Sequence, residues 1–477
     1  MKEYLTFDDV LLLPNYSDID VQKISVDVEL TPTIKLSVPF CSAAMDTVTE
    51  SKLAISMALN GGIGIIHKNF SLEEQVAEVA NVKEFKFKYE ENIYSLSDDV
   101  TLQVVKDKAF NLGLSQVIII NEKQEVTGII TQRDLSFIDL NQSVKEFLVD
   151  KKVVYINKND SAKKAYDLML ENSITKIIVV DDHLKLVGIT TLKQIEELDK
   201  YTNCAVDGTN RLLCGAAIST SEDAIERASA LIDAGLDMLV IDSAHGNSKR
   251  VIDLVSKIRD LGKKIVIVAG NVVTPDAVVN LAKAGADIVK VGIGSGSICT
   301  TRVISGVGAP QLSAVMECSE AAKKVGVKII ADGGIKYSGD IVKALAAGAD
   351  VVMLGSMLSG HEESPGEKII SNDKVYKSYI GMGSLKAMKR GGGERYFQAK
   401  NKKYVPEGVE ALVEYKGFID NTLYQLVGGL KSGLGYNGAE NLIDLHKNAK
   451  FIKITAAGKV ESHPHSLDVI SNAPNYK

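Results

Sequence analysis

The chain has 477 residues, of which 45% are hydrophobic and 24% are charged. This length exceeds what one hydrophobic core usually serves, so we expect at least two domains. A formal net charge of −6 gives no global basic surface, so we expect no obligatory nucleic-acid partner.

The sequence carries no pattern typical of secretion or membrane insertion. The first residues, from Met1 to Asp9, include acids where a signal peptide would have an apolar run. No apolar stretch is long enough to span a bilayer, so we expect no membrane contact. Five cysteines, an odd number spread along the chain, are not typical of a disulfide framework. A cytoplasmic protein with reduced thiols is therefore expected.

Short apolar runs alternate with helical patterns such as 221–234 and 275–284, which favours parallel βα units. The tetrapeptides at 234–237, 284–287 and 347–350 each end a helix with Ala-Gly before the next strand. Eight such units predict a (β/α)8 TIM barrel, with a doubly wound sheet as the competing topology. The predicted strands are Val38–Ala44, Gly62–His67, Leu212–Ile218, Met238–Asp242, Ile265–Ala269, Ile288–Gly292, Lys328–Ala331 and Val351–Leu354.

An internal repeat interrupts this barrel between its second and third strands. The runs Val117–Ile120 and Ile177–Val180 lie sixty positions apart, and Gly128–Leu135 and Gly188–Ile195 keep the same offset. A repeat of this kind is a supersecondary unit that buries one face against its copy. The predicted divisions are a first barrel part at 1–87, an inserted domain at 88–203 and a second barrel part at 204–477.

Cys299 differs from the other four cysteines in its surroundings. It follows the glycine-rich segment Gly292–Ser297 at the end of the sixth predicted strand, and two threonines and Arg302 come directly after it. Glycines allow tight turns that expose backbone N–H and C=O groups to a ligand or ion, and a neighbouring cation favours thiolate. We therefore predict a nucleophile at Cys299. Structural roles are expected for the other cysteines, Cys41, Cys204, Cys214 and Cys318.

Glycine-rich segments follow the seventh and eighth predicted strands, at Ala331–Ile335 and Val352–Ser356. Barrels commonly bind phosphate at this place through backbone N–H groups. Asp332 is expected to accept hydrogen bonds from sugar hydroxyls, because a carboxylate and a phosphate would repel each other. Asp242, after the fourth strand, can hold a ribose diol, whereas His245 is interpreted mainly as a structural residue. These segments predict a phosphorylated nucleoside as ligand.

A long, polar, glycine-rich region at 377–417 is typical of a mobile lid, with the flap itself predicted at about 384–417. Tyr396 and Phe397 argue against a disordered loop, because solvated flexible loops are poor in aromatic residues. Arg395 would be an unusual base, since the pKa of arginine is about 12 or higher. It would need a water molecule and hydroxyl groups held against it.

Together these segments resemble the IMP dehydrogenase / GMP reductase family. The resemblance is carried by Leu5–Val10, Met45–Thr49, Gly296–Arg302, Glu394–Phe397 and Val405–Glu410. It implies oxidation of inosine 5′-monophosphate (IMP) to xanthosine 5′-monophosphate with NAD+ and water, in guanine nucleotide synthesis. The flap favours the dehydrogenase, because the reductase performs no hydrolysis and lacks the Arg-Tyr pair. A GMP reductase, and a nucleotide-sensing scaffold with an inactive barrel, remain alternative hypotheses.

The resemblance also implies residue roles. Cys299 would add to C2 of the hypoxanthine ring, and Arg395, Tyr396 and Thr301 would activate water to hydrolyse the thioimidate that follows. The implied IMP contacts are Ser297, Asp332, Gly333, Gly334, Gly355, Ser356, Tyr379, Gly381, Met382, Gly383 and Glu407. The implied NAD contacts are Asp242, Gly292, Ile293 and Gly294. The implied potassium (K+) ligands are carbonyls of Gly294, Gly296 and Cys299, completed by Glu461, Ser462 and His463 of a neighbouring subunit in a homotetramer or octamer.

The inserted repeat resembles paired CBS modules. In that family a Thr and an Asp near the end of a module often contact the ribose of an adenine or guanine nucleotide, which implies ATP or GTP as a ligand. Thr131 and Asp134 match in the first copy, whereas the second copy has Thr191 and Gln194. A pair that only mediates assembly is the alternative.

Three places depart from the pattern of the barrel family. Ile380 stands where Arg is usual, Ala44 where Pro is usual, and Gly391–Gly393 where a Ser-rich stretch is common. The change at Ile380 removes a charge near the expected substrate and leaves its effect on nucleotide affinity open. None of the three removes a reacting group.

Overall fold

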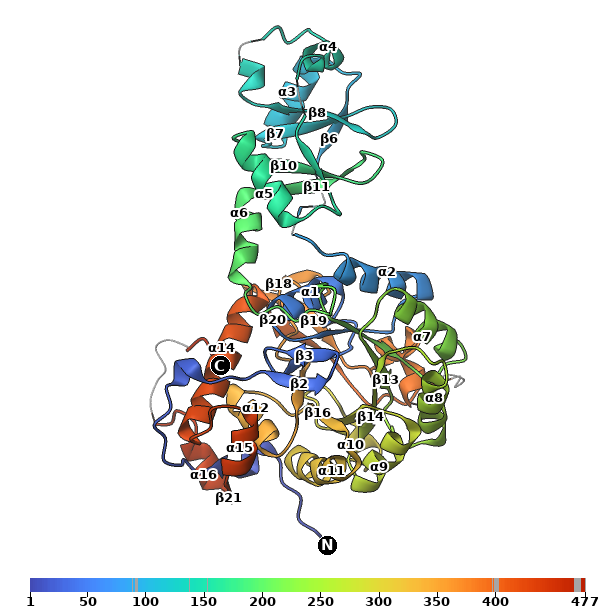
Figure 1. Ribbon diagram of the computed structural model, residues 1–477, viewed down its shortest axis with the longest axis vertical. Coiled ribbons are helices and arrows are strands. Elements are labelled where there is room, and N and C mark those ends of the chain that lie inside the picture. Colours follow the sequence, from blue (N-terminus) through green and yellow to red (C-terminus); the bar gives the residue numbers. More distant parts are fainter. Residues whose placement is uncertain are drawn as a thin grey trace. The chain divides into compact units, whose positions relative to one another are not determined.

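The computed structural model describes residues 1–87, 89–90, 93–136, 138–151, 153–396, 398, 403–466 and 473–476. The chain forms two compact units (Figure 1). The first unit comprises Met1–Lys83 and Asn203–Lys477, and the second comprises Glu84–Thr202. Each unit has hydrophobic clusters of its own.

Eight parallel strands of the first unit close into a barrel, which confirms the predicted (β/α)8 fold over the doubly wound sheet. The strand order is β4-β17-β16-β15-β14-β13-β12-β5. Two hydrogen bonds of 3.1 Å, between Ser42 N and Ile63 O and between Ile63 N and Phe40 O, join β4 to the residue that directly precedes β5 and so close the barrel. The strands are β4 (Phe40–Ser42), β5 (Gly64–Ile66), β12 (Cys214–Ile218), β13 (Met238–Asp242), β14 (Val266–Val272), β15 (Ile288–Val291), β16 (Lys328–Asp332) and β17 (Val351–Leu354).

Helices follow the strands and cover the outside of the barrel, as Figure 1 shows for α7, α8, α9 and α11. Helix α9 has the predicted bounds, because Pro275 fits a first helical turn and Gly285, with φ 107°, ends the helix in a left-handed conformation. The helices of this unit are α1 (Ser51–Leu59), α2 (Leu72–Lys83), α7 (Ala224–Asp233), α8 (Lys249–Arg259), α9 (Pro275–Ala284), α10 (Thr301–Ile304), α11 (Gln311–Val325), α12 (Ser338–Ala346), α13 (Leu385–Lys389), α14 (Ile419–Tyr436), α15 (Leu442–Asn448) and α16 (Ala456–Glu461).

Smaller sheets complete the first unit. Strand β1 (Val10–Leu12) pairs with β21 (Phe451–Lys453), so a segment near the amino terminus lies beside one near the carboxyl terminus. The remaining elements are the hairpin β2 (Val28–Thr31) and β3 (Ile34–Leu36), the sheet β18 (Lys368–Ser371), β19 (Lys374–Ile380) and β20 (Glu410–Glu414), and the short 3-10 helices η1 (Phe7–Asp9), η2 (Val21–Lys23) and η5 (Gly392–Tyr396).

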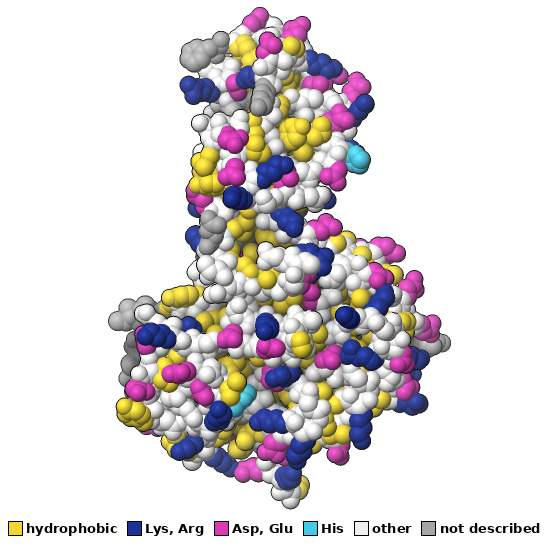
Figure 2. Space-filling view, in the orientation of Figure 1, with side chains coloured by type: hydrophobic (Ala, Val, Ile, Leu, Met, Phe, Trp, Pro, Cys, Tyr) yellow, Lys and Arg dark blue, Asp and Glu magenta, His cyan; other side chains and the backbone are white. Residues whose placement is uncertain are grey.

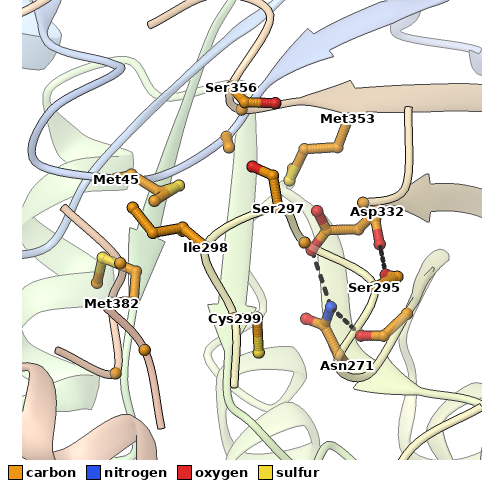
Figure 3. Close-up of a pocket in the computed structure, with 18 of the residues that line it drawn as sticks. Met45, Asn271, Ser295, Ser297, Ile298, Cys299, Asp332, Met353, Ser356 and Met382 are labelled. Carbon is orange, nitrogen blue, oxygen red and sulfur yellow. Dashed lines mark hydrogen bonds between the residues drawn. The ribbon is translucent and has the colours of Figure 1, made fainter. Parts of the chain in front are cut away.

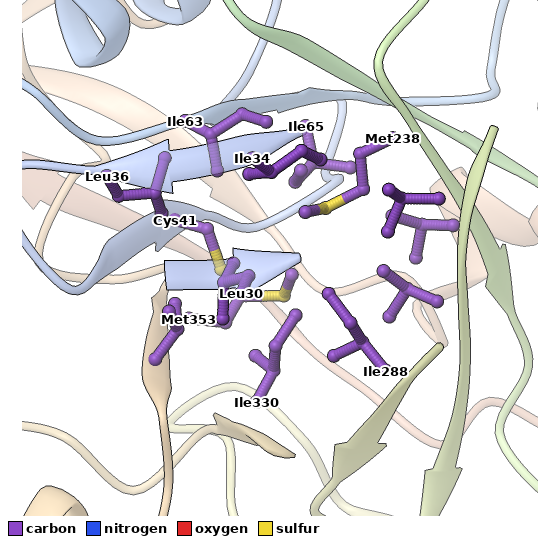
Figure 4. Packing of buried hydrophobic residues seen from close by; sticks show 14 of the residues in the cluster. Leu30, Ile34, Leu36, Cys41, Ile63, Ile65, Met238, Ile288, Ile330 and Met353 are labelled. Carbon is purple, nitrogen blue, oxygen red and sulfur yellow. The ribbon is translucent and has the colours of Figure 1, made fainter. Parts of the chain in front are cut away.

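Alternate residues of the strands fill the barrel interior (Figure 4). Val240, Ile288 and Ile330 belong to this cluster, and the β2–β3 hairpin adds Leu30, Ile34 and Leu36. Successive side chains of a strand point to opposite faces, so a residue two positions further along points inward again. The residues two positions beyond the first three are Asp242, Lys290 and Asp332. The barrel therefore carries a layer of charged side chains at the carboxyl ends of its strands.

The second unit repeats one β-α-β-β pattern. The first copy has β6 (Ser95–Ser97), α3 (Leu102–Asn111), β7 (Gln116–Ile120) and β8 (Val126–Thr131), followed by η3 (Asp134–Ser136) and α4 (Val144–Leu148). The second has β9 (Tyr155–Asn157), α5 (Ala162–Glu171), β10 (Lys176–Val180) and β11 (Leu186–Thr191), followed by α6 (Leu192–Glu196) and η4 (Glu197–Lys200). Ile118 and Ile178 share a hydrophobic cluster, so the copies bury apolar surface against each other.

No helix in the described part of the chain is long and apolar enough to cross a bilayer. On the face drawn in Figure 2, acidic and basic side chains are interspersed and no single basic patch dominates. This surface agrees with the charge balance of the sequence, which offers no broad attraction for polyanions.

Candidate active site

A cavity of about 170 Å³ lies at the carboxyl ends of the barrel strands (Figure 3). Its walls combine the strand ends, the loop around Cys299 and part of the predicted flap. Most residues proposed from the sequence meet here. They are Asp242, Gly292, Gly294, Gly296, Ser297, Cys299, Asp332, Gly333, Gly334, Gly355, Ser356, Tyr379, Gly381, Met382, Gly383, Arg395, Tyr396 and Glu407. Among the described residues that line the cavity, Asp242 is present and His245 is not.

The Cys299 thiol is presented by a tight turn after β15. The Cys299 amide donates to the Gly296 carbonyl at 3.1 Å, and the thiol donates to Thr301 Oγ1 at 3.2 Å. The thiol sulfur also lies 3.8 Å from the Glu407 carbonyl oxygen, and Thr300 N donates to that same carbonyl at 2.9 Å. The Thr301 hydroxyl thus lies next to the thiol and accepts a hydrogen bond from it.

Glycine is required where this loop begins. Gly292 has φ 148°, and a β-carbon built there would lie 2.1 Å from the Asp332 carbonyl oxygen. Any side chain at this position would push apart the ends of β15 and β16. Glycine at position 292 therefore allows the Cys299 loop to approach Asp332 closely.

Arg302, the cation next to the thiol in the sequence, holds the loop backbone instead. Its Nε donates to the Ile293 carbonyl at 3.1 Å, and its terminal nitrogen donates to the Ala309 carbonyl. Burial lowers the pKa of Arg302, and the nearby Cys299 thiolate would oppose that shift. Arg302 thus fastens the loop backbone while its charge stays close enough to interact with the Cys299 thiolate. Ile293 contributes the backbone carbonyl of this contact.

The other cysteines lie in different environments. Cys41, Cys214 and Cys318 are buried free thiols, and burial raises the pKa of all three, for Cys318 to about 12. Cys204 is half-buried, and burial raises its pKa as well. Raised pKa values keep these thiols protonated and poorly nucleophilic at neutral pH.

Two polar residues that sequence reasoning missed organise the floor of the cavity. Lys290, whose side chain is 3% exposed, donates to Asp242 Oδ1 at 2.9 Å and to Asp332 Oδ2 at 2.7 Å. It also donates to Asn271 Oδ1 at 2.5 Å, and the Asn271 amide donates to Asp332 Oδ2 at 2.8 Å and to the Gly292 carbonyl at 2.6 Å. One ammonium therefore joins the acid expected to bind NAD to the acid expected to bind IMP.

A lysine inside an apolar strand gave little signal in the sequence. The signal that could have found Lys290 is its spacing, because it lies two positions after Ile288 on the inward face. Asn271 lay beyond the predicted end of its strand, which continues to Val272 in the structure.

The flap residues Arg395 and Tyr396 enter the cavity from η5. The Arg395 guanidinium forms an ion pair with Asp242 Oδ2, and the Arg395 carbonyl accepts from Ala244 N at 3.1 Å. Burial raises the pKa of Tyr396, and the adjacent Arg395 opposes that shift. A β-carbon at Gly383 would lie 2.8 Å from the Tyr396 ring, so glycine leaves room for the phenol. Phe397, also expected to matter here, lies outside the described residues.

The wall opposite the flap offers backbone groups and hydroxyls. Gly333, Gly334, Gly355 and Ser356 follow β16 and β17, as predicted for a phosphate site. Burial raises the pKa of Tyr379 to about 12, so its phenol stays a neutral donor near this wall. Ile380 is buried, and its amide donates to Thr47 Oγ1 at 3.1 Å.

The carboxyl-terminal residues expected at a potassium site lie elsewhere in the same chain. Glu461 ends α16, Ser462 caps it, and the His463 ring lies 5.9 Å from the rings of Tyr337 and Tyr476. Among the described residues, no cluster of His, Cys, Asp or Glu has the form of a metal site. A site built from backbone carbonyls would not contain such side chains, so this finding leaves the potassium prediction as it stands.

Known proteins resemble this chain over nearly its full length. A family model described as "IMP dehydrogenase / GMP reductase domain" matches residues 4–465. The inosine-5′-monophosphate dehydrogenases of Halalkalibacterium halodurans and Bacillus subtilis are each 47% identical, with 100% of this chain and 98% of each relative covered. Among solved structures, a variant of the Trypanosoma brucei GMP reductase in complex with guanosine 5′-monophosphate is 36% identical, with a TM-score of 0.76 and coverage of 98% of this chain and 99% of that chain.

Proposed function

The chain belongs to the IMP dehydrogenase / GMP reductase family, and from this premise we propose that it oxidises IMP to xanthosine 5′-monophosphate with NAD+ and water. One observation carries the proposal: Arg395 and Tyr396 line the same cavity as Cys299. A flap that delivers these groups to the thiol suits a reaction in which a covalent intermediate is hydrolysed. The full-length relatives with 46–47% identity are named as dehydrogenases, which supports the same choice.

IMP would lie along the wall that follows β15, β16 and β17. Its phosphate would accept from backbone N–H groups of Gly333, Gly334 and Gly355 and from the Ser356 hydroxyl. Asp332 would accept from the ribose hydroxyls. The base would then point toward Cys299, between Met382, Gly383 and Glu407. The remaining proposed contacts are Ser297, Tyr379 and Gly381.

Cys299 would act as the nucleophile of the first step. The thiolate sulfur forms a bond to C2 of the hypoxanthine ring, and the hydrogen on C2 then leaves as a hydride. This leaves a thioimidate that joins C2 to Cys299 and divides a hard substitution into two easier steps. Thr301 and the Glu407 carbonyl surround the thiol sulfur and fix its position.

NAD+ bound beside C2 would accept that hydride. The residues present fit such a ligand, because Asp242 offers a carboxylate for a ribose diol and the Gly292, Ile293 and Gly294 turn leaves its backbone open. In the structure Asp242 is paired with Arg395. The flap and the cofactor would therefore use the same side of the cavity in turn.

The hydrolytic step would follow once the flap has entered. Arg395, with the hydroxyls of Tyr396 and Thr301, would take a proton from water as its oxygen bonds to C2, and the thiol of Cys299 would leave. The balanced reaction converts IMP, NAD+ and water into xanthosine monophosphate, NADH and a proton.

A potassium ion would order the Cys299 loop. Carbonyl oxygens suit this weakly polarising cation, and the Cys299–Gly296 hydrogen bond shows that the loop is folded back on itself. Gly294, Gly296 and Cys299 would supply carbonyls. Glu461, Ser462 and His463 of a second copy would complete the shell in a homotetramer, two of which can form an octamer.

The second unit would bind a purine nucleotide such as ATP or GTP. Asp134 Oδ2 accepts from Thr131 N at 2.8 Å and from Thr131 Oγ1 at 2.6 Å, which presents the acid at the start of η3. Gln194 makes the same two contacts with Thr191, at 2.9 and 3.0 Å. The copies thus share one local geometry, and of Asp134 and Gln194 only Asp134 offers a carboxylate to a ribose.

The free cysteines fit a cytoplasmic location.

The steady-state assay with IMP and NAD+, with and without potassium, tests the proposal. We expect IMP-dependent NADH absorbance that rises with potassium. Consumption of NADPH with GMP instead, and no NADH from IMP, would establish the reductase. If neither assay shows turnover and the second unit still binds a nucleotide, the result would favour the sensing scaffold.

A further inference from the structure

The flap helix η5 is held to the barrel on two sides. On the cavity side, Arg395 pairs with Asp242 and its carbonyl accepts from Ala244. On the other side, the preceding residue, Glu394, contacts the barrel through its own side chain. Glu394 belongs to the Glu-Arg-Tyr-Phe segment of the flap, and the chemistry described above gives it no task.

Two barrel side chains converge on the Glu394 carboxylate. Lys68 Nζ donates to Glu394 Oε2 at 3.0 Å, and Ser219 Oγ donates to the same oxygen at 2.5 Å. Lys68 also donates to the Gly391 carbonyl at 3.1 Å, one residue before η5. The flap is therefore joined to the barrel by a carboxylate and a backbone carbonyl that share one ammonium.

The partners of Glu394 stand on the rigid part of the molecule. Lys68 follows β5 and Ser219 follows β12, two strands that are hydrogen-bonded neighbours in the barrel. Asp242 ends β13, the next strand in the sheet. Three successive strand ends thus hold η5 in place, while Cys299 follows β15 further around the barrel.

The contacts are shielded enough to matter energetically. The Lys68 side chain is 9% exposed and that of Glu394 is 33% exposed. Burial lowers the pKa of Lys68, and the Glu394 carboxylate opposes that shift. Charge-assisted hydrogen bonds in partly buried places are stronger than exposed ion pairs. Opening the flap would break them all at once.

Glycines at the start of η5 make this contact geometrically possible. Gly391 has φ 106°, and a β-carbon at Gly392 would lie 2.8 Å from the Ala387 carbonyl oxygen. The stretch Gly391–Gly393, which departs from the family pattern, thereby turns the chain so that the Gly391 carbonyl faces Lys68.

We propose that Lys68, Ser219 and Glu394 form a latch that keeps the flap closed during hydrolysis of the Cys299 adduct. The proposal rests on the proposed function, in which hydride transfer needs the flap outside the cavity and hydrolysis needs it inside. The three residues are positioning residues: they act through Arg395 and Tyr396 and do not touch the reacting atoms.

A weakened latch has a particular kinetic signature. Hydride transfer takes place with the flap open, so the first NADH burst keeps its rate and amplitude. Hydrolysis slows by about tenfold, the factor expected for losing one charge-assisted hydrogen bond from the closed state. The Cys299 adduct then accumulates, and the KM for NAD+ falls because the flap competes less with the cofactor.

The test uses the full-length protein with Glu394→Gln, Ser219→Ala and Lys68→Met, and with Lys68→Arg, which keeps the cation. Glu74→Gln is the matched control, because Glu74 lines the same surface hollow as Glu394 but bonds to Ser71 at the start of its own helix. Rapid-mixing absorbance gives the burst, steady-state rates give kcat and KM, and acid-quenched intact-mass spectra give the fraction of enzyme carrying the adduct.

We expect the three disrupting variants to show an unchanged burst, a lower kcat, a lower KM for NAD+ and a larger adduct fraction, with Lys68→Arg and Glu74→Gln close to the original protein. Equal adduct fractions in all variants would overturn the latch. So would loss of the burst in Ser219→Ala and Glu394→Gln, since it would place these residues in hydride transfer. Absence of any IMP-dependent burst in the unaltered protein would instead refute the proposed function.

Discussion

At the scale of residues, the site depends on charges that are buried together. Lys290 lies between Asp242 and Asp332, and Arg395 approaches Asp242 from the flap. Two acids and two cations balance in a place where all four side chains are largely shielded from solvent, so an unpaired charge would be costly. Of these four side chains, Arg395 alone belongs to the predicted flap, so a movement of the flap out of the cavity would leave Asp242 with one cation fewer.

Replacing Lys290 should remove the ammonium group that holds Asp242 and Asp332 close together. Lys290→Met leaves two carboxylates facing each other, so we expect about 3 kcal/mol less stability against urea and at least about tenfold weaker IMP binding by calorimetry. Lys290→Arg keeps the charge and should retain more of both properties. Unchanged IMP affinity in Lys290→Met would show that Asp332 does not rely on this lysine.

The site was only partly predictable from the sequence. The Cys299 turn, the glycine loops and the Arg395–Tyr396 pair stand out because their residue types are unusual in those places. Lys290 does not stand out, because a single lysine within an apolar strand can point into the barrel or away from it. Its direction follows only once the inward-facing residues of the strand are known. Arg302 shows a related limit: the sequence places its charge near Cys299 but does not reveal that its guanidinium donates to backbone carbonyls of the loop.

At the scale of elements, local rules set most boundaries. Pro275 and Gly285 fix the ends of α9 where the sequence indicated them. Strand β14 instead runs on to Val272, past Gly270 and Asn271, which lie beyond the predicted end of the strand at Ala269. Its extension is supported by the neighbouring strand, because Val272 pairs with Val291 of β15. Tertiary pairing of this kind has no signature in a single segment.

The carboxyl-terminal helix α16 offers a pH-dependent test. Asp8 accepts from Lys336 at 2.8 Å and from Lys459 of α16 at 2.7 Å. Burial alone would raise the pKa of Asp8, but these two lysines outweigh it and lower the pKa to about 2. Because the folded pKa lies below the unfolded value of about 3.9, the contact stabilises fully above that value and is lost as pH falls toward 2.

Hydrogen exchange of 456–461 should therefore accelerate between about pH 4 and pH 2 relative to α11, after correction for intrinsic exchange. Asp8→Asn removes the carboxylate, so its α16 should exchange faster at neutral pH and change less on acidification. Equal protection of α16 in both proteins at neutral pH would contradict the assigned contact.

At the scale of the whole molecule, the two units keep separate cores. The chain leaves the barrel after Lys83, which donates to the Leu212 carbonyl at 2.8 Å and pairs with Asp207 and Asp237 at 3.0 and 2.7 Å. These partners all belong to the first unit. Residues of the first unit therefore fasten the barrel at the point where the chain leaves it.

Removal of 84–202, with a short Gly-Ser linker in their place, should leave a folded barrel. We expect IMP-dependent NADH production within about twofold of the full chain, because the units are independently packed. The assay compares both proteins at equal concentration and checks folding by circular dichroism. A soluble, folded barrel without activity would show that the second unit is needed to form the site.

The central claim is that Cys299 carries the substrate covalently between two steps. The most direct measurement is peptide mass spectrometry of an acid-quenched mixture of the protein, IMP and NAD+ during steady turnover. The account predicts a purine nucleotide adduct on the peptide containing Cys299, absent from Cys299→Ala and enriched in Arg395→Ala. Steady NADH formation with an unmodified Cys299, or an adduct on another residue, would contradict it.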